Sequence, residues 1–159
     1  MSSIIYTPDD YNQFNVLNIP RLVIVITLYS LKHYLLFAIP IMAYLPILQR
    51  VAQPLLKVMP STDYSNGALL FSCLPALLVL ISMARRRPEA NIWLKRFWHH
   101  GRGLLLLSLI LEIVIWLFEI IFWQQKLNEM ILMFLYINVV FIIYLLRSQR
   151  AKDVFAEFP

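Results

Sequence analysis

A few strongly polar residues stand inside long apolar stretches of the sequence, and these are the residues whose types and spacing could do chemistry. Lys32 and His33 interrupt one such stretch, Glu112 interrupts a second and Asn138 a third. A lysine, a carboxylate and an imidazole in an apolar environment can pair with one another, relay protons or ions, or pair with charges of a partner subunit. All three interpretations are open from the sequence.

The apolar stretches have the length of membrane spans. Residues 104–123 are almost unbroken in apolar character, and at about 1.5 Å per residue they cover roughly 30 Å, the hydrocarbon thickness of a bilayer. The chain is 60% hydrophobic and 14% charged, far from the composition of soluble globular proteins. We therefore predict an all-α integral membrane protein, a four-helix transmembrane bundle. Its spans are expected at residues 22–45, 68–84, 104–123 and 130–146.

Two shorter amphipathic segments, 47–59 and 90–100, are predicted to lie in the membrane interface. Both are too polar to span, and each separates an apolar side from a charged side. In the second segment tryptophans stand beside cations, which favours contact with anionic headgroups. The predicted lipid headgroup surface consists of Arg85, Arg86, Arg87, Trp93, Lys95, Arg96, Trp98 and Arg102.

The flanks and the helix-breaking residues complete the expected layout. Residues 1–21 are expected to lead into the first span, and residues 147–159 to form a short tail. Pro40 and Pro46 predict kinks toward the far end of the first span. Two glycines, Gly101 and Gly103, are expected to loosen the entry to the third span.

Lysines and arginines are distributed unevenly between the two sides of such a bundle. Ten lie on the side of both termini and the 85–102 connection, three lie on the other side, and Lys32 lies within a span. The positive-inside rule therefore predicts that both termini are cytoplasmic. The same distribution accounts for the net charge of +5, so no nucleic-acid partner is expected.

Depth along the helices places the polar residues at nearly one level. At about 1.5 Å per residue, Lys32 lies roughly 15 Å from the cytoplasmic edge, and Glu112 and Asn138 lie roughly 12 Å from it. An unpaired charge at the bilayer centre costs about 2.5–3.5 kcal/mol. We therefore predict that Lys32 and Glu112 pair inside the bundle. Asn138, Tyr29 or His33 would then satisfy the remaining hydrogen-bonding groups.

Other reactive side chains are not spaced for catalysis or metal binding. His99 and His100 are adjacent, so on a helix they point about 100° apart and cannot bind one metal ion from one face. Cys73 is the single cysteine and has apolar neighbours, and three glycines form no phosphate-binding loop. Glu119 is expected near the outer interface, where a hydrated carboxylate costs little. We expect no catalytic residue, no metal, no cofactor and no enzymatic activity.

Several runs of residues carry a resemblance to a known family. YTPDDY at 6–11 and LNIP at 17–20 are followed by YSLKHY at 29–34, and the later connection contains RRP at 86–88 and WHHGR at 98–102. In this layout the chain resembles the small YfeZ-like inner-membrane proteins of Gram-negative bacteria, a family of unknown function. The resemblance implies a multi-pass protein of the bacterial inner membrane with four spans. It implies no catalytic or binding residues.

These observations lead to a functional prediction and two alternatives. We predict a non-enzymatic accessory or assembly protein that packs against a larger membrane complex, because the chain is small, lacks catalytic spacing and is rich in interfacial aromatics. The first alternative is a small oligomeric transporter or channel, coupled to ions or protons through Lys32, Glu112 and Asn138. The second is a lipid-interacting protein that acts through residues 85–102. The expected partners are anionic membrane lipids and either another membrane protein or further copies of this chain.

Overall fold

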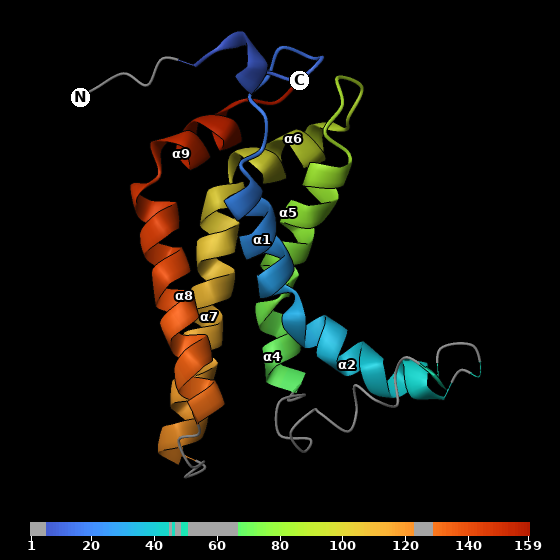
Figure 1. Cartoon of the computed structure of the whole chain (residues 1–159), viewed down its shortest axis with the longest axis vertical. Coiled ribbons are helices and arrows are strands. Elements are labelled where there is room, and N and C mark those ends of the chain that lie inside the picture. Colours follow the sequence, from blue (N-terminus) through green and yellow to red (C-terminus); the bar gives the residue numbers. More distant parts are fainter. Residues whose placement is uncertain (1–5, 45, 47–48, 51–66, 123–128) are drawn as a thin grey trace.

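The computed structural model describes residues 6–44, 46, 49–50, 67–122 and 129–159, and in this part of the chain every regular element is a helix. The predicted all-helical class is therefore confirmed. Residues 6–20 and the C-terminus lie at the same end of the molecule (Figure 1). The helices are η1 (Pro8–Asp10), α1 (Arg21–Ser30), α2 (Lys32–Ala43), α4 (Gly67–Ser72), α5 (Leu74–Ala84), α6 (Ile92–His99), α7 (Gly101–Phe122), α8 (Glu129–Arg147) and α9 (Gln149–Ala156).

Among the described residues, three helical segments are long and apolar enough to cross a membrane. They are Gly67–Ala84, which comprises α4 and α5, and the single helices α7 and α8. The first two helices reach the same length and composition only together, as a pair bent by 48°. By length and composition the described helices thus indicate a membrane protein with three apolar spans, or with four if the bent pair is one span. The predicted interfacial segment 47–59 lies outside the described residues, except for positions 49 and 50.

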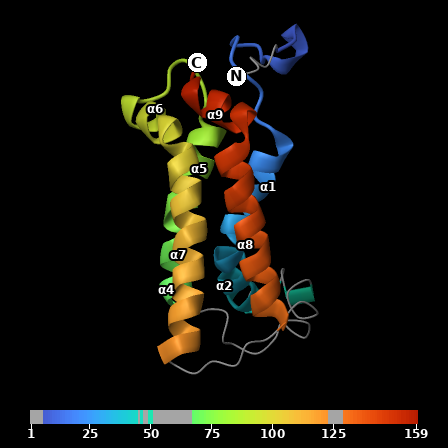
Figure 2. The ribbon, with the colours of Figure 1, turned by 90° about the vertical axis from the view of Figure 1, so that its left-hand side faces the viewer.

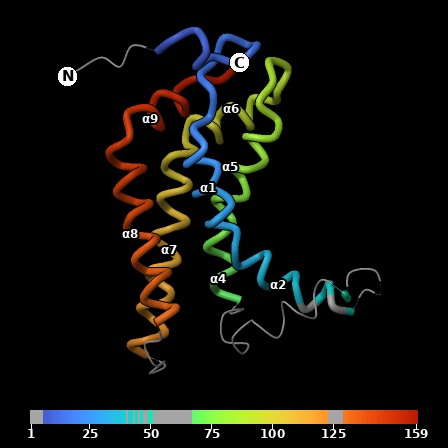
Figure 3. Tube along the Cα trace, viewed as in Figure 1, coloured from blue at the N-terminus to red at the C-terminus, as the bar shows by residue number. Residues whose placement is uncertain are grey.

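The first span is bent at Leu31, between α1 and α2. Leu31 has φ −94° and ψ 4°, and its N–H donates to the carbonyl of Leu28, only three residues back. From this point α2 leaves the bundle, as the Cα trace in Figure 3 shows. Pro40 lies inside α2 and Pro46 follows its end, so kinks at these two prolines stay predictions.

Two hydroxyl groups in α1 account for the position of the bend. Thr27 donates to the carbonyl of Val23 at 2.8 Å, and Ser30 donates to the carbonyl of Ile26 at 2.9 Å. Hydroxyls that bond to the carbonyl one turn back weaken the backbone ladder and bend helices. The sequence therefore interrupts the helix directly before Lys32.

The second span is interrupted at Cys73, between α4 and α5. Pro75 lies in the first turn of α5, where its missing N–H removes no helical hydrogen bond. The Ser108 hydroxyl of α7 donates to the carbonyl of Ser72 at 2.6 Å. A side chain of a neighbouring helix thus satisfies a backbone group at the interruption, as apolar surroundings require.

α7 is the central helix of the bundle. It contacts α1, α4, α5, α6, α8 and α9, and Figure 2 shows it side by side with α8. Its buried leucines and its buried tryptophan belong to two apolar clusters. The larger cluster includes Leu105 and Leu109 and lies toward the end that holds the termini. The smaller comprises Leu69, Trp116 and Ile131.

An end cap, formed by α6, α9 and residues 6–20, closes the bundle at the end of the termini (Figure 1). The expected short tail is therefore partly helical, and it buries Ala151, Val154 and Phe155 on one side of α9. Gly101 makes this packing possible, because a Cβ atom there would lie 2.5 Å from Cε1 of Phe155. Gly101 and Gly103 do not loosen the chain as predicted, since both lie within the regular helix α7.

Candidate functional site

Lys32 of α2 and Glu112 of α7 form an ion pair. Nζ of Lys32 lies 2.6 Å from Oε1 and 2.7 Å from Oε2 of Glu112, so one ammonium group donates to both carboxylate oxygens. The side chain of Glu112 is 2% exposed and that of Lys32 is 13% exposed. The contact predicted from the cost of burying either charge alone is therefore present. Because little solvent reaches the pair, its attraction is only weakly screened.

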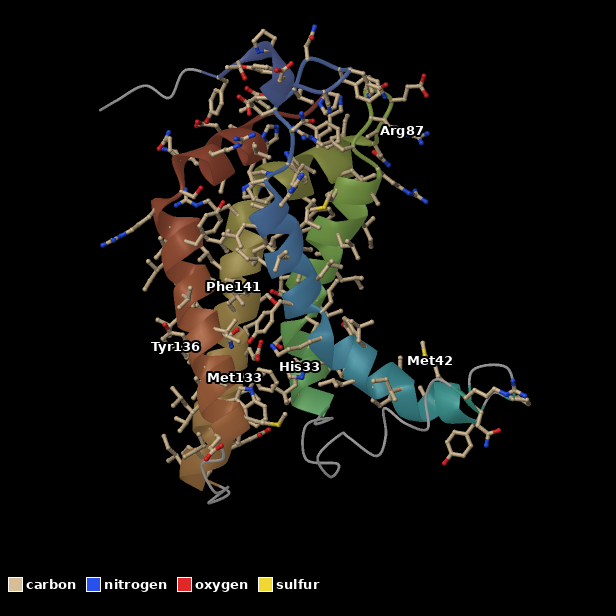
Figure 4. The ribbon with its side chains drawn as sticks, viewed as in Figure 1. His33, Met42, Arg87, Met133, Tyr136 and Phe141 are labelled. Atoms are coloured by element: carbon tan, nitrogen blue, oxygen red, sulfur yellow. The ribbon has the colours of Figure 1, made fainter. Side chains whose placement is uncertain are left out.

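His33 completes a charge cluster with these two residues. Its Nε2 lies 3.4 Å from Oε1 of Glu112, and its ring is completely buried. Its Nδ1 has no hydrogen-bond partner among the described residues. The bend at Leu31 makes Lys32 and His33 the first two residues of α2, so both reach α7 from the junction of the helices, where Figure 4 labels His33.

Aromatic rings of α1 and α8 surround the ammonium group of Lys32. Its Nζ lies 3.9 Å from the centroid of the Tyr29 ring and 5.2 Å from that of Phe134. The Tyr29 hydroxyl donates to the carbonyl of Phe134 at 3.3 Å, and Phe141 packs edge-on against Tyr29 at 5.1 Å. Cation–π contacts replace part of the hydration that the ammonium group loses. Four elements, α1, α2, α7 and α8, thus hold the charge cluster.

Asn138, a predicted member of the polar layer, makes no hydrogen bond to the charge cluster in the described part of the chain. It lies on the same side of α8 as Phe134 and Phe141, at helical spacing. Its side chain is completely buried, and neither of its polar atoms has a hydrogen-bond partner among the described residues. The physical reason is that aromatic rings, and not an amide, cover the ammonium group on the side of α8.

The charge cluster separates the two apolar clusters of the bundle. Along α7, Leu105 and Leu109 belong to the larger cluster, Glu112 follows, and Trp116 belongs to the smaller one. Glu119 is also buried, with 3% of its surface exposed, and so it is not the hydrated carboxylate that the sequence led us to expect. The reason is its spacing of seven residues from Glu112, which places it on the same inward side of α7.

This arrangement can hold a fixed charge pair and can also hold or exchange a proton. An ammonium group, a carboxylate and an imidazole in contact are groups that accept and donate protons. No group of three His, Cys, Asp or Glu side chains lies together in a way that could hold a metal ion, as far as the described ranges extend. The expectations that the protein binds no metal or cofactor and is not an enzyme stay predictions.

Arg86 and Trp98 are buried, so they are wrongly placed in the predicted lipid headgroup surface. The guanidinium of Arg86 donates to the carbonyls of Leu17 and Glu157, at 2.8 and 3.0 Å. The indole N–H of Trp98 donates to the carbonyls of Val154 and Glu157, at 3.0 and 2.8 Å. The guanidinium also lies 4.8 Å from the Trp98 ring. Backbone carbonyls at the end of α9 have no helical hydrogen-bond donor, and the side chains of Arg86 and Trp98 donate to them.

The rest of the predicted headgroup surface divides into structural and exposed residues. Arg102 donates to the carbonyls of Leu145 and Leu146, at 2.8 and 3.0 Å, and thereby caps the end of α8. Lys95 donates to the carbonyl of Pro88 at 3.3 Å. The exposed members are Arg85, Arg87, Trp93 and Arg96. Their contact with lipid stays a prediction.

Sequence reasoning missed the polar contacts that join the two ends of the chain. The Tyr6 hydroxyl donates to the Asp153 carboxylate at 2.6 Å, and Arg150 pairs with Asp10 at 2.7 Å. Burial, followed by the hydrogen bond to Asp153, raises the pKa of Tyr6 to about 12. Two hydrogen bonds from Thr7, together with Arg150, hold the pKa of Asp10 below its usual value.

One signal in the sequence could have revealed this end cap. Ala151, Val154, Phe155 and Phe158 recur at helical spacing, which is typical of an amphipathic helix that packs on a neighbour. The polar pairs themselves join residues that are about 140 positions apart, as in the bond from Arg150 to Asp10. Pairing over such a separation has no local signature.

The family model that matches this chain is described as "Protein of unknown function (DUF2919)", and it covers residues 6–157. No curated protein matches the chain, and no solved structure matches it. The matched range includes every residue of the charge cluster and of the end cap.

Proposed function

The chain belongs to the DUF2919 family, whose description assigns no activity, and we propose that it is a non-enzymatic accessory or assembly protein of a bacterial inner membrane. In this role it packs within the bilayer against a larger membrane complex. The observation that carries the proposal is the course of α2, which leaves the bundle at a 48° bend and exposes apolar side chains. The most exposed are Leu35 (60%), Ile41 (54%), Phe37 (44%) and Met42 (40%).

The charge cluster gives α2 a fixed direction. Lys32 and His33, at its first turn, both contact Glu112 of α7. A helix that is held at its base by a buried ion pair loses little conformational freedom when it docks, which favours binding. Leu35 and Met42 are seven residues apart, so they share one side of α2 and offer the spacing with which helices pack in membranes.

Orientation and location complete the proposal. The excess of lysines and arginines at the end cap supports cytoplasmic termini. The YfeZ-like layout of residues 6–34 supports the inner membrane of a Gram-negative bacterium. The proposal also places both ends of the chain on the cytoplasmic side, and it counts α1 and α2 together as one of four spans.

Site-specific photo-crosslinking tests whether α2 contacts another protein. A photoreactive phenylalanine replaces Leu35 in cells, and a matched control replaces Leu132, which is 54% exposed on α8. We expect a protein adduct from position 35 and none from position 132, together with a native mass that shows a stoichiometric complex. Adducts from position 35 that contain only lipid or a second copy of the chain would overturn the proposal.

A second function, transport of ions or protons by a small oligomer, is favoured by one specific observation. His33 Nδ1 and both polar atoms of Asn138 are buried without a hydrogen-bond partner in the described part of the chain. They lie near the level where the first two spans are interrupted, at Leu31 and Cys73. Interrupted helices beside ionisable residues form the ion sites of several transporters.

Proton flux into vesicles tests this second function. The purified protein is reconstituted in liposomes that contain a pH-sensitive dye, and a pH step is applied. Transport predicts flux above that of protein-free vesicles, and Asn138→Leu, which removes no hydrogen bond among the described residues, should reduce it. Flux equal to that of protein-free vesicles would exclude the alternative for protons.

A further inference from the structure

The loop between α5 and α6 borders an open surface pocket of about 430 Å³ at the end-cap side of the bundle. The residues that line it include Arg85, Arg87 and Glu89 from the loop, and Asn91 and Leu94 at the start of α6. All but Leu94 are exposed. The pocket therefore combines two positive groups and one negative group at a surface that ligands can reach. Figure 4 labels Arg87 on this loop.

The three charged side chains of the pocket are not used by the fold. Arg86, between the two arginines, is turned inward to the carbonyls of Leu17 and Glu157. Arg85, Arg87 and Glu89, in contrast, make no side-chain hydrogen bond or ion pair with any other described residue. Their charges are thus available for a ligand.

Hydrogen bonds to backbone carbonyls of the loop hold its course. Lys95 of α6 donates to the carbonyl of Pro88 and lies 5.5 Å from the ring of Phe158. The N–H of Ala90 donates to the carbonyl of Arg87 at 3.0 Å. The backbone that carries Arg85, Arg87 and Glu89 is therefore held in place before a ligand binds, which lowers the entropic cost of binding.

The position of the pocket corresponds to the headgroup level of a bilayer. It lies where α5, part of an apolar span, ends at Ala84. Beside it, α6 exposes Ile92 (75%) and Trp93 (61%). The guanidinium of Arg96 lies 5.7 Å from the Trp93 ring. An exposed tryptophan and a cation next to a span are typical of the membrane–water interface.

We propose that this pocket binds the zwitterionic headgroup of a phospholipid that carries a primary ammonium group, as phosphatidylethanolamine does. Arg85 and Arg87 would bind the phosphate, because guanidinium groups hold phosphate oxygens in bidentate fashion. Glu89 would accept hydrogen bonds from the ammonium group. The carboxylate disfavours a ligand with only negative charge, and a quaternary ammonium group could not donate to it. The inference is independent of the protein partner proposed above.

Native mass spectrometry of the full chain in mild detergent tests the proposal. The protein is titrated with phosphatidylethanolamine, phosphatidylcholine and phosphatidylglycerol. We expect one phosphatidylethanolamine bound at least tenfold more tightly than either of the others. Arg85→Gln combined with Arg87→Gln should weaken that binding at least tenfold. The matched control, Arg147→Gln, removes an exposed cation at the same end of the bundle and should leave it unchanged.

Glu89→Gln is the discriminating variant. It should abolish the preference for phosphatidylethanolamine over phosphatidylglycerol without altering thermal stability, since Glu89 is exposed and makes no side-chain hydrogen bond or ion pair with another described residue. Soluble glycerophosphoethanolamine should compete with the lipid, whereas inorganic phosphate at the same concentration should not. Displacement by inorganic phosphate, equal binding of the anionic lipid, or an unchanged preference in Glu89→Gln would each overturn the proposal.

Discussion

Replacing either partner of the Lys32–Glu112 pair should destabilise the protein more than replacing both. At 2.6 Å and an effective dielectric constant near 20, the attraction between the two charges is about 6 kcal/mol, and much of it offsets their desolvation. A single variant, Lys32→Met or Glu112→Met, leaves the other charge buried without its partner. We expect each to lower the free energy of unfolding by about 3–5 kcal/mol.

The double variant Lys32→Met/Glu112→Met should recover most of this loss. It removes both charges and replaces them with apolar side chains of similar volume, so no unpaired charge remains. Replacements of this kind are often neutral or stabilising, and we expect a stability within about 1 kcal/mol of the wild type or above it. Strong departure from additivity is the signature of direct contact.

The free energy of unfolding can be measured by steric trapping or by denaturant titration in bicelles. Lys152→Met is the matched control, because Lys152 is exposed on α9, and it should change stability by less than about 0.5 kcal/mol. A double variant no more stable than the worse single variant would refute the pairing. Single variants as stable as the wild type would refute the burial of the charges.

Three further predictions concern the end cap. Gly101→Ala should destabilise the protein by about 2 kcal/mol, because the added Cβ would clash with the buried ring of Phe155. Gly103→Ala is the control and should not destabilise it, because a Cβ at that position meets open space. Equal melting temperatures of the two variants would contradict this prediction. Arg86→Ala should cost about 3 kcal/mol through two lost charge-assisted hydrogen bonds, and denaturant titration against the wild type checks it. The Tyr6 contact stabilises the folded state fully below pH 10 and is lost between pH 10 and about 12. The difference between tyrosinate titrations of the wild type and Tyr6→Phe should therefore centre near pH 12, and a midpoint near pH 10 would contradict the contact.

The contact between Lys32 and Glu112 could be predicted because the membrane makes the cost of unpaired charge large. Each residue stands alone in an apolar stretch, and similar depths leave few partners for either. Whether Asn138 bonds to this pair could not be predicted in the same way. The depth of a residue in the membrane does not determine which side chain lies against the ammonium group of Lys32. The rings of Tyr29 and Phe134 occupy that place.

The bend of the first span illustrates a limit of local rules. Proline is the common cause of a kink, so the sequence directs attention to Pro40. The 48° bend at Leu31 follows no proline, and it comes after two hydroxyls that bond to carbonyls one turn back. Whether such hydroxyls bond to their own helix or to a neighbouring one depends on packing. The direction of α2 therefore depends on packing as well.

The helical class, the apolar spans and the need to pair the buried charges can all be predicted from the order of the residues. Those properties follow from hydropathy and from the cost of unpaired polar groups in an apolar medium, and both can be read along the chain. The roles of Arg85, Arg86 and Arg87, in contrast, depend on contacts between distant parts of the chain. Three adjacent arginines look alike in the sequence, yet Arg86 turns inward because the carbonyls of Leu17 and Glu157, far apart along the chain, meet beside it.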